Sequence, residues 1–282
     1  MERRQVRLSG GTEVSVLMAG DRAAPAVLLL HGFPSSANTF RAIVPALAQV
    51  ARVIAPDLPG YGASEPLASP SFAALTHAIG EVLAALEVGP RHLYLHDYGA
   101  PVGLGLALRQ PALVRGLIVQ NANAHRSGFG PAWAQTLDYY LHPTPDNEAA
   151  ATAHLTAAGV RDQYVAGVPE EIAARIPPAV WEEDWRVMQL PGRMATQRAL
   201  VADYARHIDR FPAIAAYLGE RQPPALLLWG RHDAFFDLAE TLSWMQALPR
   251  MEAHILDGGH FLLETHAAPA AALLAEFVRR TG

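Results

Sequence analysis

Short aliphatic runs alternate with longer helical patterns along this 282-residue chain, and this alternation constrains the fold more than any other feature. The run at 26–30 carries no polar residue, which is typical of a strand buried on both faces of a sheet. We therefore predict an α/β fold, with a mostly parallel central sheet and helices on both faces. The expected strands are 14–18, 26–30, 53–55, 92–96, 117–119, 225–229 and 254–256. The expected helices are 39–48, 72–86, 101–109, 238–247 and 267–279.

The alternation stops between about residues 124 and 218, where the sequence shows no convincing strand. Helix formers and aromatic residues dominate this stretch, and prolines break it repeatedly. After it, the first pattern returns. We predict a helical cap inserted into the sheet domain, with the core at 1–123, the cap at 124–218 and the second part of the core at 219–282.

Composition excludes several classes of protein. The chain has no cysteine, which rules out disulfides, thiolate metal sites and a cysteine nucleophile. Its net charge of −5 argues against a nucleic-acid surface, and its longest apolar run, 23–30, is too short to span a bilayer. The histidines show no metal-ligand spacing. We expect a cytoplasmic monomer or homodimer that binds no metal, nucleic acid or membrane.

Chemically reactive residues follow the ends of three expected strands, where catalytic groups of open parallel sheets collect. The first group is His96-Asp97-Tyr98-Gly99, at a junction of strand, turn and helix. It has the form of the nucleophile elbow G-x-S-x-G, with Leu95 in place of the first glycine and Asp97 in place of the serine. The alternative is that Asp97 only caps the helix, because aspartate is a favoured N-cap residue.

The other two groups supply an acid and a histidine. Asp233 follows the expected strand 225–229, and His260 follows 254–256 after two glycines. Each residue alone is explained by an ordinary loop. With Asp97, however, they give the chain order nucleophile, acid, base at three strand ends, which is the order of one class of hydrolytic triad.

A fourth segment, His31-Gly32-Phe33-Pro34, follows the buried strand 26–30. A loop at this position can supply one backbone N–H to an oxyanion hole, here from Phe33, and the residue after the nucleophile, Tyr98, can supply the other. We expect His31 to hold the loop in place. The glycine-rich loop 57–64 lacks the phosphate-binding pattern, so we predict no phosphate site there.

Together these segments resemble the α/β-hydrolase superfamily over the whole chain, the cap included. With an aspartate at the position of the nucleophile, the chain is similar to one branch of this superfamily. That branch contains epoxide hydrolases, haloalkane dehalogenases and fluoroacetate dehalogenases. The resemblance implies that Asp97 attacks a saturated carbon to give an alkyl ester, which water activated by His260 then hydrolyses. It also implies that Asp233 orients His260 and that no cofactor is needed.

The leaving group separates the members of this branch. An opened epoxide needs a proton donor, and epoxide hydrolases resemble one another in using one or two cap tyrosines. The resemblance implies Tyr204 as one donor, and Tyr139 or Tyr140 as the second. We therefore expect an epoxide hydrolase that converts a small apolar or aromatic epoxide to a diol.

Haloalkane dehalogenation by the same triad is the alternative. Such enzymes typically carry tryptophan after the nucleophile, where this chain has Tyr98, although Trp133 and Trp185 of the cap could compensate. We expect both tryptophans and Asn123 to contact substrate. Packing in the core would also explain the tryptophans, and support of the loop backbone would also explain Asn121 and Asn123. A fluoroacetate dehalogenase would need an arginine beside the nucleophile, which is absent. A non-catalytic ligand-binding protein and a cofactor-free oxygenase rank lower.

Overall fold

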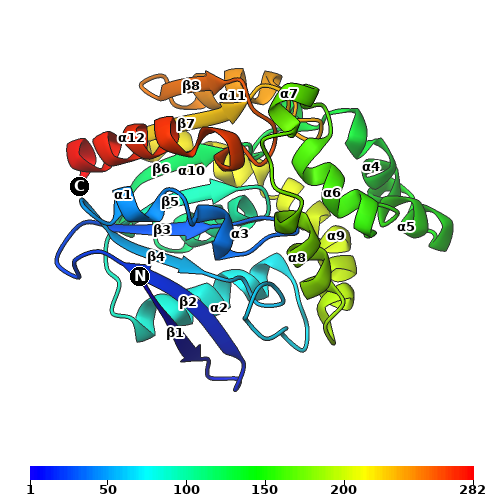
Figure 1. The fold of residues 1–282 in the computed structure, drawn as a ribbon, viewed down its shortest axis with the longest axis horizontal. Coiled ribbons are helices and arrows are strands. Elements are labelled where there is room, and N and C mark those ends of the chain that lie inside the picture. The colour runs from blue at the N-terminus through cyan, green and yellow to red at the C-terminus, as the bar shows by residue number, and fades with distance from the viewer.

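The computed structural model, which describes residues 1–282, contains one eight-stranded sheet in the order β1-β2-β4-β3-β5-β6-β7-β8. The strands from β3 to β8 run parallel, whereas β1 and β2 are antiparallel to their neighbours. Helices cover both faces of the sheet, and the cap helices gather at one end of it (Figure 1). The mostly parallel α/β sheet is therefore confirmed. Its strands are β1 (Glu2–Arg7), β2 (Glu13–Ala19), β3 (Ala26–Leu30), β4 (Arg52–Pro56), β5 (Arg91–His96), β6 (Val114–Gln120), β7 (Ala225–Gly230) and β8 (Glu252–Leu256).

Alternate side chains of the central strands enter two separate hydrophobic cores, one on each face of the sheet. In β3, Leu28 and Leu30 enter the first core, and Val27 and Leu29 enter the second. Because both faces are covered, the strand carries no polar residue, which is why its sequence is an unbroken aliphatic run. The first core is closed by α2 (Phe72–Ala85), α3 (Gly99–Arg109), α10 (Phe211–Arg221) and α11 (Ala239–Ala247). The second is closed by η1 (Ala37–Phe40), α1 (Val44–Leu47) and α12 (Leu263–Thr281).

Two elements differ from the prediction. The sequence does not predict β1, because its side chains are mostly charged and exposed, and the strand is held by backbone pairing with β2. The expected single helix at 39–48 is wrong: the chain forms the short η1 and then the one-turn α1. Pro45 lies in the first turn of α1, where its missing N–H is tolerated but where a continuous helix would lose a hydrogen bond.

Between β6 and β7 the chain forms helices and turns, and Phe129 of this stretch makes an isolated bridge with Phe236, which follows β7. The division of the chain into core and cap at 124 and 218 stays a prediction, and α10 packs against the core helices α3 and α11. No helix combines the length and the hydrophobicity that a membrane span requires. The remaining elements are η2 (Pro111–Leu113), η3 (Arg126–Gly128), η4 (Pro131–Trp133), α4 (Ala134–Leu141), α5 (Pro145–Ala151), α6 (Ala157–Val165), α7 (Glu170–Ala173), α8 (Ala179–Met188) and α9 (Arg193–Ile208).

Candidate active site

Asp97 lies at the sharp turn between β5 and α3. Its φ is +48°, a left-handed conformation that a residue with a side chain rarely adopts. The turn fits against β3 because Gly99 has no side chain: a Cβ there would lie 2.2 Å from the carbonyl oxygen of Leu30. The N-cap of α3 is Tyr98, and no side chain makes a capping bond there. Helix capping therefore does not explain Asp97, whereas strain at this position is typical of a functional site.

Backbone N–H groups hold the carboxylate of Asp97. The N–H of Phe33 donates to Asp97 Oδ1 at 2.6 Å, and the backbone of Tyr98 also favours the charged form of the carboxyl group and lowers its pKa. The loop that carries Phe33 is fixed by His31, whose Nε2 accepts the N–H of Leu58 at 2.9 Å. The structure thus brings together the two backbone donors that the sequence predicts, and it gives His31 a supporting place in the loop.

Burial dominates the electrostatics of Asp97. It raises the pKa of the carboxyl group to about 6, although His260 and the N–H groups of Tyr98 and Phe33 favour the charged form. Asp233 adds a smaller effect that raises the pKa further. The group is therefore mostly ionised at pH 7, and it keeps little of the hydration that would weaken it as a nucleophile in water.

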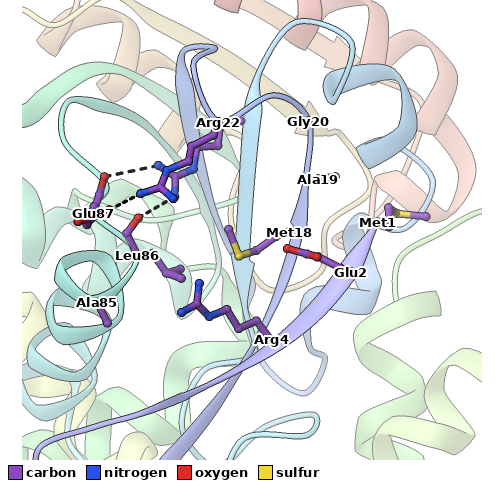
Figure 2. A pocket seen from close by; sticks show the side chains of 11 residues that line it. Met1, Glu2, Arg4, Met18, Ala19, Gly20, Arg22, Ala85, Leu86 and Glu87 are labelled. Carbon is purple, nitrogen blue, oxygen red and sulfur yellow. Dashed lines mark hydrogen bonds and ion pairs between the residues drawn. The ribbon is translucent and has the colours of Figure 1, made fainter.

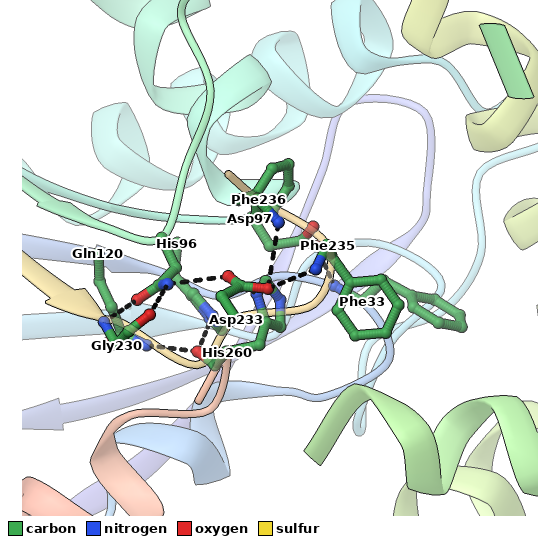
Figure 3. A network of polar contacts seen from close by, with 10 residues as sticks. Phe33, His96, Asp97, Gln120, Gly230, Asp233, Phe235, Phe236 and His260 are labelled. Atoms are coloured by element: carbon green, nitrogen blue, oxygen red, sulfur yellow. Dashed lines mark hydrogen bonds and ion pairs between the residues drawn. The ribbon is translucent and has the colours of Figure 1, made fainter. Parts of the chain in front are cut away.

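His260 and Asp233 form a buried hydrogen-bonded pair (Figure 3). His260 Nδ1 lies 2.8 Å from Asp233 Oδ2, while His260 Nε2 is buried and has no partner. Burial alone would lower the pKa of His260, but Asp233, and to a smaller extent Asp97, outweigh burial and raise it above the usual value. The free nitrogen can therefore accept a proton from water, and the resulting imidazolium would be stabilised by Asp233.

Asn121 supports the acid. Its side-chain amide donates to Asp233 Oδ2 at 2.8 Å, and its Oδ1 accepts the N–H of Gly230 at 2.9 Å. The other oxygen of Asp233 accepts the N–H groups of Phe235 and Phe236. The structure therefore supports the explanation in which Asn121 holds a loop backbone.

Two further polar side chains, His96 and Gln120, fix the loop of His260. Each lies 3.2 Å from the carbonyl oxygen of His260 (Figure 3). Sequence analysis assigned them no role. The available signal is their position: each is a buried polar residue at the carboxyl end of its strand, β5 or β6, directly after an aliphatic residue.

A cavity of about 180 Å³ contains Asp97 in its wall and lies between the core and the cap. The core contributes Phe33, Tyr98, Phe235 and Phe236, so the wall around the carboxylate is mainly apolar. No arginine lines the cavity, so an anionic substrate would find no cationic partner there. The cavity can therefore hold a small neutral molecule against Asp97.

Some of the cap residues predicted to contact substrate reach this cavity and others do not. Trp133 and Tyr140 line it. Tyr139 does not, because neighbouring residues on α4 point in different directions. Trp185 packs against the hydrophobic core instead, and Asn123 is fully buried beneath the turn at Gly128.

The two remaining candidate proton donors differ in their hydrogen bonding. The hydroxyl of Tyr140 donates to the carbonyl oxygen of Val201 at 2.6 Å. The hydroxyl of Tyr204 is buried without a partner, and its ring packs against those of Tyr98 and Trp133, which line the cavity, whereas Tyr204 itself does not. Burial, and then the charge of Asp97, raise the pKa of Tyr204 well above its usual value, so that this hydroxyl stays protonated and free to donate.

Three polar residues of the cavity wall, Thr136, His154 and Gln163, carry no functional signal in the sequence. All three lie in the cap, on or between α4 and α6, where no regular period links them to the triad. No chemical pattern in the sequence identifies these residues, because only the packing of the cap on the core brings them to the cavity of Asp97.

A larger, open groove lies at the N-terminal edge of the sheet, where the charged residues of its wall come from β1, β4 and the segments that follow β2 and α2 (Figure 2). Its volume is about 760 Å³, but Arg22 is paired with Glu87 across it, and no nucleophile with a base lies there. The structure also contains no cluster of three His, Asp or Glu side chains able to hold a metal ion. The cavity at Asp97 is therefore the candidate active site.

A family model described as alpha/beta hydrolase fold matches residues 25–267. This chain belongs to the α/β-hydrolase family. The hydrolase is 34% identical over 273 residues to an uncharacterized hydrolase of Saccharomyces cerevisiae, with 95% of this chain and 93% of the yeast protein covered. It is 28% identical over 283 residues to haloalkane dehalogenase 2 of Mycobacterium tuberculosis, with 90% and 88% covered.

Solved structures agree with this assignment of the fold. The hydrolase superposes on the epoxide hydrolase CorEH with a TM-score of 0.78 and 22% sequence identity, and 99% of each chain is covered. At this identity the match supports the fold alone.

Proposed function

We propose that this α/β-hydrolase converts small neutral epoxides to diols through an ester on Asp97. One observation carries the proposal: the Asp97 carboxylate sits at a strained elbow, 2.6 Å from the Phe33 N–H, in a cavity without cations. The unpartnered hydroxyl of Tyr204 and the free Nε2 of His260 support it. Such a carboxylate is ionised at pH 7 without a separate base, and it can attack a saturated carbon.

In the first step, the oxygen of Asp97 that Phe33 does not hold attacks an epoxide carbon. The carbon–oxygen bond of the ring breaks, and the resulting alkoxide takes the proton of the Tyr204 hydroxyl. An alkyl ester of Asp97 and a Tyr204 phenolate result. The neutral tyrosine is suited to this task because its hydroxyl has no other acceptor in the folded protein.

In the second step, His260 Nε2 removes a proton from water, and the water oxygen attacks the carbonyl carbon of the ester. The N–H groups of Phe33 and Tyr98 stabilise the oxyanion that forms. The diol oxygen leaves with the proton of the His260 imidazolium, and the Asp97 carboxylic acid returns its proton to the Tyr204 phenolate. Epoxide and water are consumed, one diol is released, and every residue regains its starting state.

Haloalkane dehalogenation is a second candidate because Trp133 lines the cavity and its indole N–H could bind a departing halide. The similarity to haloalkane dehalogenase 2 also supports it. The two candidates share the Asp97 ester and differ only in the leaving group. Both candidates therefore need His260 to hydrolyse the ester, but only epoxide opening needs Tyr204 as a proton donor.

The experiment that tests the proposal uses the His260→Gln protein, which should form the ester and fail to hydrolyse it. The protein is incubated separately with styrene oxide and with 1-bromobutane, and the Asp97 peptide is examined by mass spectrometry. His77→Gln, at an exposed site on α2, is the matched control and should release product without accumulating ester. An adduct from the epoxide supports the proposal. An adduct only from the bromide assigns the site to dehalogenation, and no adduct from either contradicts both assignments.

A further inference from the structure

One buried side chain in the cavity wall is not used by the proposed reaction. Gln163, on α6, is 6% exposed and lines the cavity. Its amide is not among the buried polar groups that lack a partner, and no hydrogen bond joins it to the protein, so its polar atoms remain accessible. The free donors and acceptor of Gln163 therefore face the space that a substrate would fill.

The position of this amide relative to the triad is fixed by its neighbour. Tyr164 stacks on Phe261 with ring centroids 3.9 Å apart, and Phe261 directly follows His260. The hydroxyl of Tyr164 also donates to Asp184 of α8. Because α6 is tied in this way to the loop of the catalytic histidine, Gln163 is held at a defined place in the wall of the cavity that contains Asp97.

His154 adds a second polar group to the same part of the cap. Burial lowers the pKa of its imidazole, which is therefore neutral at pH 7. A neutral imidazole offers one donor and one acceptor nitrogen. The hydroxyl of Thr136 also belongs to the cavity wall. The cap side of the cavity is thus polar but uncharged, while the core side is apolar.

We propose that Gln163 binds a neutral oxygen-bearing group of the substrate, such as an ether or hydroxyl, at a distance from the reacting epoxide. This inference rests on the proposed function and names the substrate class: oxygenated epoxides in preference to hydrocarbon ones. A hydrocarbon would leave the amide desolvated and unpaired, and a carboxylate would be buried without a cation. The Gln163 side-chain N–H groups donate to the substrate oxygen.

The test compares two epoxides of the same length and shape, phenyl glycidyl ether and 4-phenyl-1,2-epoxybutane, which differ by one oxygen in place of one methylene. The value of kcat/KM for each is measured with the parent protein, with Gln163→Leu and with Gln163→Met. Gln189→Leu, at an exposed position after α8, is the matched control. The ratio of the two kcat/KM values removes effects that both substrates share, including partial loss of folded protein.

We expect the ratio of ether to hydrocarbon to fall about tenfold in both Gln163 variants, because a site built to hydrogen-bond a substrate group discriminates against the analogue that lacks it. The control should keep the parent ratio. An unchanged ratio in both Gln163 variants would overturn the inference, and would mean that water alone solvates the amide. That result leaves the proposed function standing, since hydrocarbon epoxides would still alkylate Asp97 in the His260→Gln protein. Failure of both epoxides to alkylate Asp97 would overturn the proposed function and this inference with it.

Discussion

The close approach of Gly32 to the nucleophile allows a sharp test of how Asp97 is positioned. A Cβ added at Gly32 would lie 2.2 Å from Asp97 Oδ1 and 2.3 Å from Asp97 Cβ. Side-chain Cβ atoms essentially never approach other atoms within 3.0 Å, so Gly32→Ala must displace the carboxylate or the loop by about 0.8 Å. Gly32 does not have a positive φ, so the substitution adds no backbone strain of its own.

A shift of this size removes Asp97 from its alignment with the reacting carbon. A misplacement of about 1 Å costs roughly 100-fold in rate, so we expect ester formation to slow by about that factor. The rate is measured as the appearance of the Asp97 adduct with styrene oxide, in the His260→Gln background, by rapid quench and mass spectrometry. Thermal unfolding is followed in parallel, because overpacking costs about 1–3 kcal/mol of stability.

Gly80→Ala is the matched control. A Cβ at Gly80, on α2, meets no atom within 4 Å, so the same substitution there should leave the rate unchanged and stabilise the helix by up to about 1 kcal/mol. If Gly32→Ala forms the ester as fast as its parent, the reasoning about the position of the nucleophile is refuted.

Three further predictions follow from the site. The rate of ester formation should fall about tenfold for each pH unit below about 6, because protonation of Asp97 removes the nucleophile, and a flat rate between pH 7 and 5 would contradict the raised pKa. Asn121→Ala should lower stability by about 2 kcal/mol and slow hydrolysis of the ester, since it leaves a buried oxygen of Asp233 short of a donor; calorimetry and single-turnover kinetics would measure the two effects. Tyr204→Phe should slow ester formation from styrene oxide by about 100-fold or more but not from 1-bromobutane, and equal losses with both would remove Tyr204 as the proton donor.

The sheet and the order of the triad could be predicted because each corresponds to a recognisable pattern in the sequence. Strands buried on both faces must be aliphatic, as in β3 and β7, so a reactive residue immediately after such a run stands out. Asp233 follows β7 in this way, whereas Asp97 and His260 were found because they also follow strands and complete the chain order of a hydrolytic triad. The strand β1 has no aliphatic run, because it lies at the edge of the sheet with its charged side chains in solvent.

The wall of the cavity could not be predicted in the same way. Tyr139 and Tyr140 are equivalent in the sequence, and only the orientation of α4 on the core places Tyr140 at the cavity. Gln163 looks like an ordinary surface residue of a helix until α6 packs over the loop of His260. Such positions depend on how the cap sits on the core, and neither hydrophobic period nor residue type records that arrangement.

The central claim is that the oxygen added to the substrate comes from Asp97 rather than directly from water. The most direct test is a single turnover of styrene oxide in ¹⁸O-labelled water, with enzyme in excess over substrate. If water attacks the carbonyl carbon of an Asp97 ester, the diol is unlabelled and the label appears in the Asp97 carboxylate. A labelled diol with an unlabelled Asp97 peptide would contradict the account, because water would then have attacked the epoxide itself.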